Sequence, residues 1–481
     1  MLKKFISNIS YLVFLNLIIK AAWVFGIDRT VQVVVGEQQY GLYFAVLNLT
    51  LMFQIFMDMG VQYYNNLRVA GDNKRLLELT PKILGLKTYL SLFYFSGLLL
   101  TGFLIGWRSE VLTLLFHVGI NIWLLTFVLY FRSSLTALGK FRQDAWISVL
   151  DRLVVILLAA PILFISSLGI EMSIKHFVLV QTAGLLISAL TAGFFVYRST
   201  GFPKFDWNFG NLIPLLRSAF PYALSVILMG AYSRLDSVMI ERMLPNGPSE
   251  AGIYAAGYRL LDVSNMLGFM FATILMPMFA AMAQRNEDAS RLLKLSMLTI
   301  IGISTATASF GIASGNGLIA FLYPGAAPYW SNVFHLLICG FIPYSMIYVA
   351  STYLMAQDRV KQLNWVYALG FFSNLIANII LIPMHGAWGA AIATLITQGT
   401  VAVILVVMAR RIQKDHLRVR TTIAMVIVPA VSIAGALFIK NLDLEWLSRA
   451  AIGAAASLGL ALAYGVIRPK QILQAFGAIR K

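Results

Sequence analysis

Fourteen apolar stretches run along the chain, each long enough to cross a bilayer. A transmembrane helix needs about 20 apolar residues, and the stretches cover 8–30, 42–64, 84–106, 112–132, 145–167, 177–197, 216–240, 252–280, 293–312, 330–354, 362–383, 388–409, 421–439 and 447–466. The gaps between them are shorter than the roughly 50 residues that a folded soluble domain needs. A membrane β-barrel would instead show short segments of alternating hydropathy. The sequence therefore predicts an all-α polytopic membrane protein with about 14 transmembrane helices.

The composition excludes several other classes of protein. Charged residues make up 12% of the chain and hydrophobic residues 59%, whereas soluble domains carry about 25% charged residues. A set of soluble domains and a disordered chain are both ruled out. Cys339 is the only cysteine, so an intramolecular disulfide and a cysteine-based zinc site are excluded as well.

The net charge of +17 follows from the distribution of basic residues across the membrane. With both termini in the cytoplasm, most of the Lys and Arg residues fall in cytoplasmic loops, as the positive-inside rule requires. The opposite side receives only Arg29, Arg108, Lys175, Arg242, Lys440 and Arg449. This asymmetry supports the orientation and the even number of spans, and it gives no reason to expect a nucleic-acid partner.

A weak internal repeat divides the chain. Gly41-Leu42-Tyr43 opens the second span and Gly252-Ile253-Tyr254 opens the eighth. Six spans separate the two motifs, so both halves enter the membrane in the same direction, which is typical of parallel repeats. We expect two pseudo-symmetric six-helix lobes, residues 1–200 and 201–411, followed by two extra helices and a cytoplasmic tail in 412–481. A substrate path would run between the lobes.

Three motifs resemble a known family. The stretch 374–394, with Asn374, Asn378, Pro383, Gly386, Gly389 and Thr394, is similar to the C-terminal signature of polysaccharide-biosynthesis transporters. The segments Ala251–Leu261 and Gln39–Tyr43 resemble that family's eighth and second helices. Together they resemble the O-antigen (Wzx-type) flippases of the multidrug/oligosaccharidyl-lipid/polysaccharide exporter superfamily. The resemblance covers most of the chain up to about residue 411.

Cations inside the spans are candidate binding residues for an anionic substrate. A charge within the bilayer costs several kcal/mol, so such a residue usually faces a cavity or a partner. Guanidinium groups match phosphate oxygens in a bidentate manner, and the resemblance implies a polyprenyl-pyrophosphate substrate. The predicted pyrophosphate-binding residues are Arg29, Arg259, Arg234 and Lys20. The alternative is that nearby aspartates (Asp28, Asp58, Asp236 and Asp262) neutralise these cations as structural pairs.

A second set of polar residues could couple transport to a cation. Asp236 lies mid-span, where a lone carboxylate is costly, and Asn374 and Asn378 are four residues apart on one helix face. The resemblance to lipid II flippases implies a Na⁺ site formed by Asp236, Asn374, Asn378 and Thr394, with H⁺ as the other coupling ion. Asn378 is neutral where an acid can occur. The alternative is that Asp236 pairs with Arg234 or with another arginine of the cleft, and that the asparagines bond only between helices.

These expectations define one function and two alternatives. We expect a flippase, not an enzyme, that moves a lipid-linked oligosaccharide across the bacterial inner membrane by alternating access. It needs no organic cofactor, and its partners are the lipid-linked oligosaccharide, membrane lipids and the polysaccharide polymerase machinery. A multidrug/cation antiporter would have a more acidic cavity. A polymerase or ligase would present a long charged outer loop, whereas residues 313–329 contain no charge.

Aromatic residues near span ends, Trp107, Tyr329 and Trp330, are predicted to lie at the membrane interface.

Overall fold

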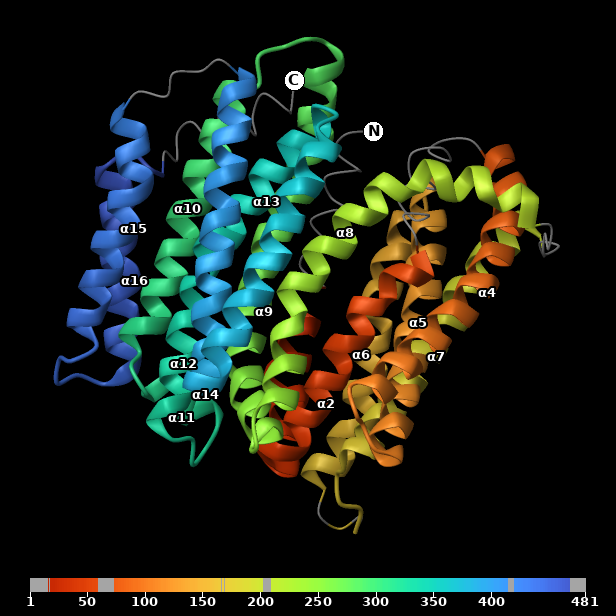
Figure 1. Ribbon diagram of the computed structural model, residues 1–481, viewed down its shortest axis with the longest axis horizontal. Helices are drawn as coiled ribbons and strands as arrows, with labels where there is room; N and C mark the ends of the chain where they lie inside the picture. Colours follow the sequence, from red (N-terminus) through yellow and green to blue (C-terminus); the bar gives the residue numbers. More distant parts are fainter. Residues whose placement is uncertain are drawn as a thin grey trace. The chain divides into compact units, whose positions relative to one another are not determined.

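The computed structural model describes residues 16, 18–58, 73–165, 167, 169–201, 209–413 and 419–467. Within these residues the secondary structure is helical and contains no β-strand (Figure 1). The chain divides into two compact units, residues 1–252 and 253–481. This confirms the all-α class. The predicted lobes, 1–200 and 201–411 with an addition at 412–481, remain a prediction.

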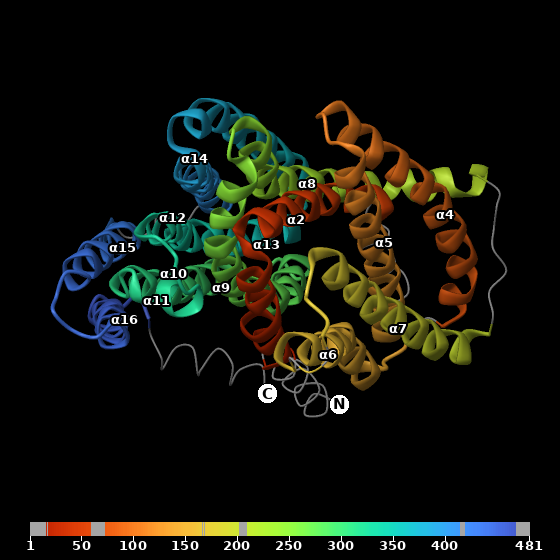
Figure 2. The same ribbon diagram turned by 90° about the horizontal axis from the view of Figure 1, so that it is seen from below.

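The first unit is a bundle of long helices. Its elements are η1 (Ala22–Asp28), which is a π-helix, α2 (Arg29–Asp58), α4 (Asn73–Leu104), α5 (Ser109–Ala137), α6 (Phe141–Phe164), α7 (Ile174–Thr200), α8 (Phe209–Met243) and the beginning of α9 (Gly247–Gln284). α7 packs against α5 and α6, and α2 packs against α5 and α8 (Figure 2). A core shared by α4 to α7 includes Leu86, Leu124, Ile147 and Leu185. Because lipid is as apolar as these side chains, close packing rather than exclusion from water holds them together.

The second unit is arranged around α10 (Ser290–Ala313). The other elements are the remainder of α9, α11 (Gly317–Leu322), α12 (Pro328–Cys339), α13 (Phe341–Ala356), α14 (Val360–Gln413), α15 (Val419–Ile439) and α16 (Trp446–Ala463). α10 contacts α13, α15 and α16 (Figure 1). The Ser345 hydroxyl lies 3.0 Å from the Ser304 hydroxyl, which joins α13 to α10. The two extra helices predicted at the C-terminus are therefore α15 and α16, packed on α10.

Two helical segments are each interrupted by one glycine. We call Ile18–Met57 the first broken helix and Val360–Ile412 the second. The interruptions fall at Gly36 (φ 83°, ψ 162°) and Gly386 (φ 61°, ψ −139°), conformations that side chains strongly disfavour. A straight helix of 54 residues, the length of α14, would be about 81 Å long against a core of about 30 Å. Each break therefore lets two limbs cross the membrane, as the separate predicted spans 362–383 and 388–409 imply for the second.

The helices are long and apolar enough for a membrane protein. Ten segments among the described residues meet that criterion. The two broken helices each cover two of the fourteen predicted spans, and the predicted spans 216–240 and 421–439 lie in α8 and α15. The prediction of a multi-pass membrane protein is confirmed.

Candidate functional site

Lys20 lies in a cluster of opposite charges in the first unit. Arg152 and Arg132 lie close enough to act electrostatically on the Lys20 amine, as does Asp151. Arg152 lies 3.5 Å from the Asp151 carboxylate and its guanidinium carbon is 4.1 Å from the centre of the Trp23 ring. Arg132 donates to Asp144 at 2.7 Å. This Lys20 cluster (Lys20, Arg132, Arg152, Asp144 and Asp151) has three positive and two negative groups, so it keeps one net positive charge.

Arg29 is the first residue of α2 and its side chain is half-buried. Its neighbour Asp28 is 1% exposed and accepts a hydrogen bond of 2.8 Å from the Tyr40 hydroxyl. Tyr40 packs edge-on against Tyr43, whose hydroxyl accepts a hydrogen bond from Gln181 at 3.0 Å. A buried acid is thus held by a tyrosine beside the predicted phosphate-binding arginine.

Arg234 on α8 contacts α2. Its Nη1 donates to the Asn48 side-chain oxygen at 3.0 Å. Asp236 follows two residues later and is 1% exposed. Residues two apart on a helix do not face each other, so the helix geometry disfavours the alternative in which Asp236 pairs with Arg234.

The first limb of α14 places two amides side by side. The Asn378 Nδ2 atom donates to Asn374 Oδ1 at 3.0 Å, and both side chains are 0% exposed. Ile376, Ile379 and Ile380, on the same limb, are more than half exposed and give it a lipid-facing side. Thr394, on the second limb, is 2% exposed. The structure brings the predicted asparagine pair together on a buried face.

The predicted site residues fall on both units. Arg29, Arg234, Lys20 and Asp236 belong to the first unit, and Arg259, Asn374, Asn378 and Thr394 belong to the second. Arg259 is half-buried on α9, one residue after Tyr258, whose ring stacks on Tyr254 at 5.5 Å. The role of each residue remains a prediction.

The two glycines that marked the internal repeat contact each other. A Cβ atom added to Gly41 would overlap the Pro248 carbonyl oxygen and the Gly252 nitrogen. The Gln32 amide also donates to the Gly252 carbonyl at 2.9 Å. The repeat motif therefore also marks a backbone contact between α2 and the beginning of α9, which the sequence did not indicate.

A second contact reaches the end of α8. The Trp107 indole N–H donates to the Glu241 carboxylate at 2.9 Å, and the two residues are 4% and 7% exposed. The other Glu241 oxygen lies 3.7 Å from Arg242. The buried Trp107 ring donates inward and does not face lipid, and its depth in the membrane stays a prediction. By the predicted topology, this contact and the Gly41–Gly252 contact both lie at the outer ends of the helices.

Lys87 is the buried cation that sequence reasoning assigned to the cytoplasmic side. It is 0% exposed in α4, and its amine lies 3.4 Å from the carbonyl oxygens of Met57 and Thr126. The Phe127 ring centre is 5.6 Å away. The burial was not predicted, because Lys87 lies at the cytoplasmic border of the predicted span 84–106, where a lysine is expected to reach water.

Comparison with known proteins gives the family. Residues 5–283, more than half of the chain, match the model of a family described as "Polysaccharide biosynthesis protein". The chain belongs to that family. It is 23% identical to YabM, an uncharacterized membrane protein of Bacillus subtilis (strain 168), over 46% of this chain and 44% of YabM. It is also 23% identical to a Shigella dysenteriae protein named as an O-antigen transporter, over 45% of this chain and 54% of that protein. The matched region spans about half the length of either relative.

Solved structures share the fold. The lipid II flippase MurJ in an inward closed conformation has a TM-score of 0.72 at 14% identity, covering 96% of this chain and all of MurJ. An inward-facing multidrug transporter of the MATE family has a TM-score of 0.61 at 12% identity, covering 85% and 98% of the two chains. Both have the fold that the motifs implied, so the predicted fold is confirmed.

Proposed function

We propose that the protein is a flippase that moves a polyprenyl-pyrophosphate-linked oligosaccharide across a bacterial inner membrane. The observation that carries this proposal is the presence of Lys20, Arg29 and Arg259 on helices long and apolar enough to span a membrane, with Arg234 on α8, in a chain of a polysaccharide-biosynthesis family. Such cations are costly in a membrane unless they serve a partner or a substrate. A pyrophosphate group offers several oxygens to bidentate guanidinium groups.

A multidrug/cation antiporter is the second candidate, favoured by the likeness to MATE transporters. Two observations count against it. An antiporter for cationic drugs needs acidic side chains, whereas this chain places cations in its spans. The MATE match also leaves about a seventh of the chain uncovered and the MurJ match does not. This favours a relative with two additional helices, which α15 and α16 supply.

Alternating access supplies the mechanism. The head group enters from the cytoplasm while the Gly41–Gly252 contact holds the outer ends of α2 and α9 together. The Trp107–Glu241 hydrogen bond holds the outer end of α8 to the connection between α4 and α5. Release on the outer side requires both contacts to separate. The prenyl chain stays in lipid, because its transfer to a polar path would forfeit about 0.8 kcal/mol per CH₂. The polysaccharide polymerase would then receive the flipped substrate.

We infer that a cation, Na⁺ in the first instance, couples this cycle through Asp236, Asn374, Asn378 and Thr394. The support is chemical: one carboxylate, two amides and a hydroxyl supply hard oxygen ligands, and all four residues are at most 2% exposed. A bound cation would offset the cost of burying the Asp236 carboxylate. H⁺ is the alternative coupling ion.

Depletion of the protein in cells tests the proposed function. The expected result is accumulation of a lipid-linked oligosaccharide on the cytoplasmic leaflet, measured by leaflet-selective enzymatic labelling of the sugar. Complementation with Arg259→Ala should leave the block in place, while the control Arg285→Ala should relieve it. Arg285 is exposed and lies after the end of α9. Depletion without accumulation of any lipid-linked intermediate would overturn the proposal.

A further inference from the structure

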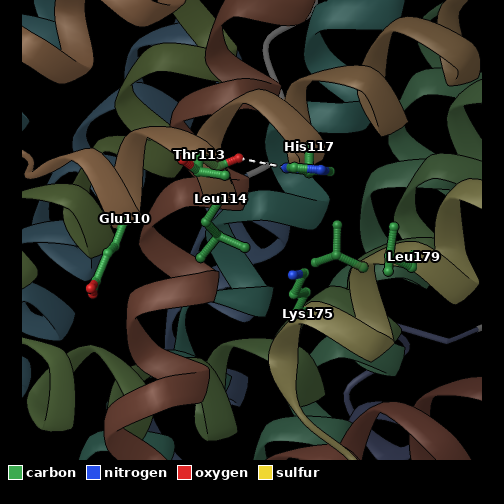
Figure 3. Close-up of a pocket in the computed structure, with 7 residues that line it drawn as sticks. Glu110, Thr113, Leu114, His117, Lys175 and Leu179 are labelled. Carbon is green, nitrogen blue, oxygen red and sulfur yellow. Dashed lines mark hydrogen bonds between the residues drawn. The ribbon is translucent and has the colours of Figure 1, made fainter.

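A groove lies between the beginnings of α5 and α7 in the first unit. Its volume is about 290 Å³. The lining residues are Glu110, Thr113, Leu114, His117, Lys175, Val178 and Leu179 (Figure 3). They come from the first turns of two adjacent spanning helices. None of them belongs to the predicted pyrophosphate or cation site, so the groove needs an explanation of its own.

The groove lies at the depth of lipid head groups and of the upper part of the acyl chains. Both helices start at its mouth, α5 at Ser109 and α7 at Ile174. From Ser109 to His117 the helix rises about 12 Å. The polar layer on each side of a bilayer is only about 5–8 Å thick. The groove therefore extends through that layer and into the hydrocarbon region.

The mouth of the groove carries one acid and one base that do not pair with each other. Glu110 and Lys175 are both exposed, and neither has an ion-pair partner within 4.0 Å among the described residues. Leu114 lies between them (Figure 3). Glu110 and Lys175 therefore offer one negative and one positive group on either side of Leu114. A ligand that carries both a positive and a negative group fits this arrangement better than a ligand with a single charge.

The floor of the groove is apolar and its wall is fixed. Leu114, Val178 and Leu179 provide aliphatic surface, with Val178 buried and Leu179 44% exposed. His117 Nδ1 lies 2.8 Å from the Thr113 carbonyl oxygen. Because a carbonyl only accepts, Nδ1 carries the hydrogen, and this bond fixes the imidazole ring as one side of the groove. An acyl chain has a smooth surface to lie on below the two charges.

We propose that this groove binds the head group and upper acyl chain of an aminophospholipid of the phosphatidylethanolamine type. The lipid ammonium group donates to Glu110, the phosphate accepts from Lys175, and the acyl chain lies on Leu114, Val178 and Leu179. Phosphatidylglycerol lacks the ammonium and would bring its uncompensated negative charge beside Glu110. A choline head group has no N–H to donate to the carboxylate. By the predicted topology, the bound lipid belongs to the outer leaflet.

Native mass spectrometry of the purified full-length protein tests the proposal, with dioleoyl phosphatidylethanolamine, phosphatidylcholine or phosphatidylglycerol added in turn. The expected result is a saturable adduct with about tenfold tighter binding of the ethanolamine lipid than of the other two. Glu110→Gln and Lys175→Gln should each weaken that binding about tenfold. The matched controls Glu171→Gln and His176→Gln, both exposed at the start of α7, should leave it unchanged.

A steric variant distinguishes groove binding from general lipid coating. Leu179→Trp adds bulk at an exposed position, so the fold should be retained and the selective adduct lost. Gel filtration of every variant checks that it is folded. Equal binding of the three lipids would overturn the proposal, and so would preference for phosphatidylglycerol that Glu110→Gln does not alter. Retention of the ethanolamine adduct by Leu179→Trp would also overturn it.

Discussion

The two broken helices have the same architecture but different polar groups. The first broken helix, Ile18–Met57, carries the ionisable residues Lys20, Asp28, Arg29 and Glu37. The second, Val360–Ile412, has no Asp, Glu, Lys or Arg between residues 362 and 409. Its buried polar groups are neutral, with the Asn374–Asn378 pair at the centre of its first limb. The two glycine-broken helices thus differ in their polar side chains: the first carries charged residues and the second carries neutral amides.

The difference points to two tasks. A charged group inside a membrane can hold an ionic head group, and it gains most where that head group displaces water. Neutral amides bind a small cation through their oxygens without leaving a net charge when the cation departs. We therefore expect substitutions in the first broken helix to affect the substrate and substitutions in the second to affect the coupling ion.

The largest expected effect is that of Arg29→Ala in the first broken helix. Loss of one hydrogen bond to a charged group costs about 1.5–3 kcal/mol, so export should fall roughly 10- to 150-fold. Lys at this position should restore export only partly, because it lacks the planar fork. Surface polysaccharide is measured against protein abundance on a blot. Arg108→Ala, an exposed arginine before α5, is the control, and equal export by the two variants would refute the assignment.

Next in size is the effect of filling the crowded glycines. Ala at Gly41 would overlap Pro248 and Gly252 on another element, whereas Ala at Gly389 would overlap the Leu381 carbonyl within the second broken helix. Forced overpacking costs about 1–3 kcal/mol, so both variants should unfold at lower temperature. Only Gly41→Ala should also separate the outer end of α2 from the beginning of α9. A cysteine placed at Glu37 in a Cys339→Ala background should then react faster with a thiol reagent.

Two glycines in open space provide the controls for this pair. No atom lies within 4 Å of a Cβ added at Gly26 in the first broken helix or at Gly399 in the second. Gly26→Ala and Gly399→Ala should therefore keep or slightly raise the unfolding temperature, since Ala favours helix over Gly by about 1 kcal/mol. Unfolding of Gly41→Ala at the temperature of Gly26→Ala would show that the close contact is not required.

The sequence was enough to predict the membrane spans but not the contacts between them. Bilayer thickness fixes the length of an apolar run, and the gap between the predicted spans 362–383 and 388–409 contains the break at Gly386. Gly41 and Gly252 were recognised only as repeat markers, because a contact across 211 positions depends on how the helices pack. The Trp107–Glu241 hydrogen bond could not be predicted for the same reason, because the two residues are 134 positions apart. Long-range pairing leaves no local pattern in a single sequence.

A smaller effect is expected from adding a charge to the second broken helix. Asn378→Asp places a carboxylate beside Asn374, which should lower the Na⁺ concentration for half-maximal flipping about tenfold, because a carboxylate binds a hard cation more strongly than an amide does. Flipping is measured in proteoliposomes with an imposed Na⁺ gradient. Asn364→Asp, on the same limb, is the control. Unchanged Na⁺ dependence in Asn378→Asp, together with normal transport by Asp236→Asn, would eliminate the proposed ion site.

The smallest effect on export is expected from Asn48→Ala in the first broken helix, where the Asn48 amide binds the Arg234 guanidinium. Asn48 accepts from Arg234 at 3.0 Å and donates to the Phe44 carbonyl at 2.9 Å. In Asn48→Ala the half-buried Arg234 keeps its charge, so export should fall only about threefold, near the lower end of what a hydrogen bond contributes.

Asn374→Ala provides the comparison, because it leaves the fully buried Asn378 amide without its 3.0 Å partner. Water cannot replace this hydrogen bond because both side chains are 0% exposed, whereas water can reach the half-buried Arg234 in Asn48→Ala. The Asn374→Ala variant should therefore lose more thermal stability than Asn48→Ala. Unfolding temperature and export are measured for both variants at equal abundance. Equal losses of export and unfolding temperature would mean that the amides have the same structural role in both broken helices. The proposed difference between a charged and a neutral broken helix would then depend on Arg29 and Lys20 alone.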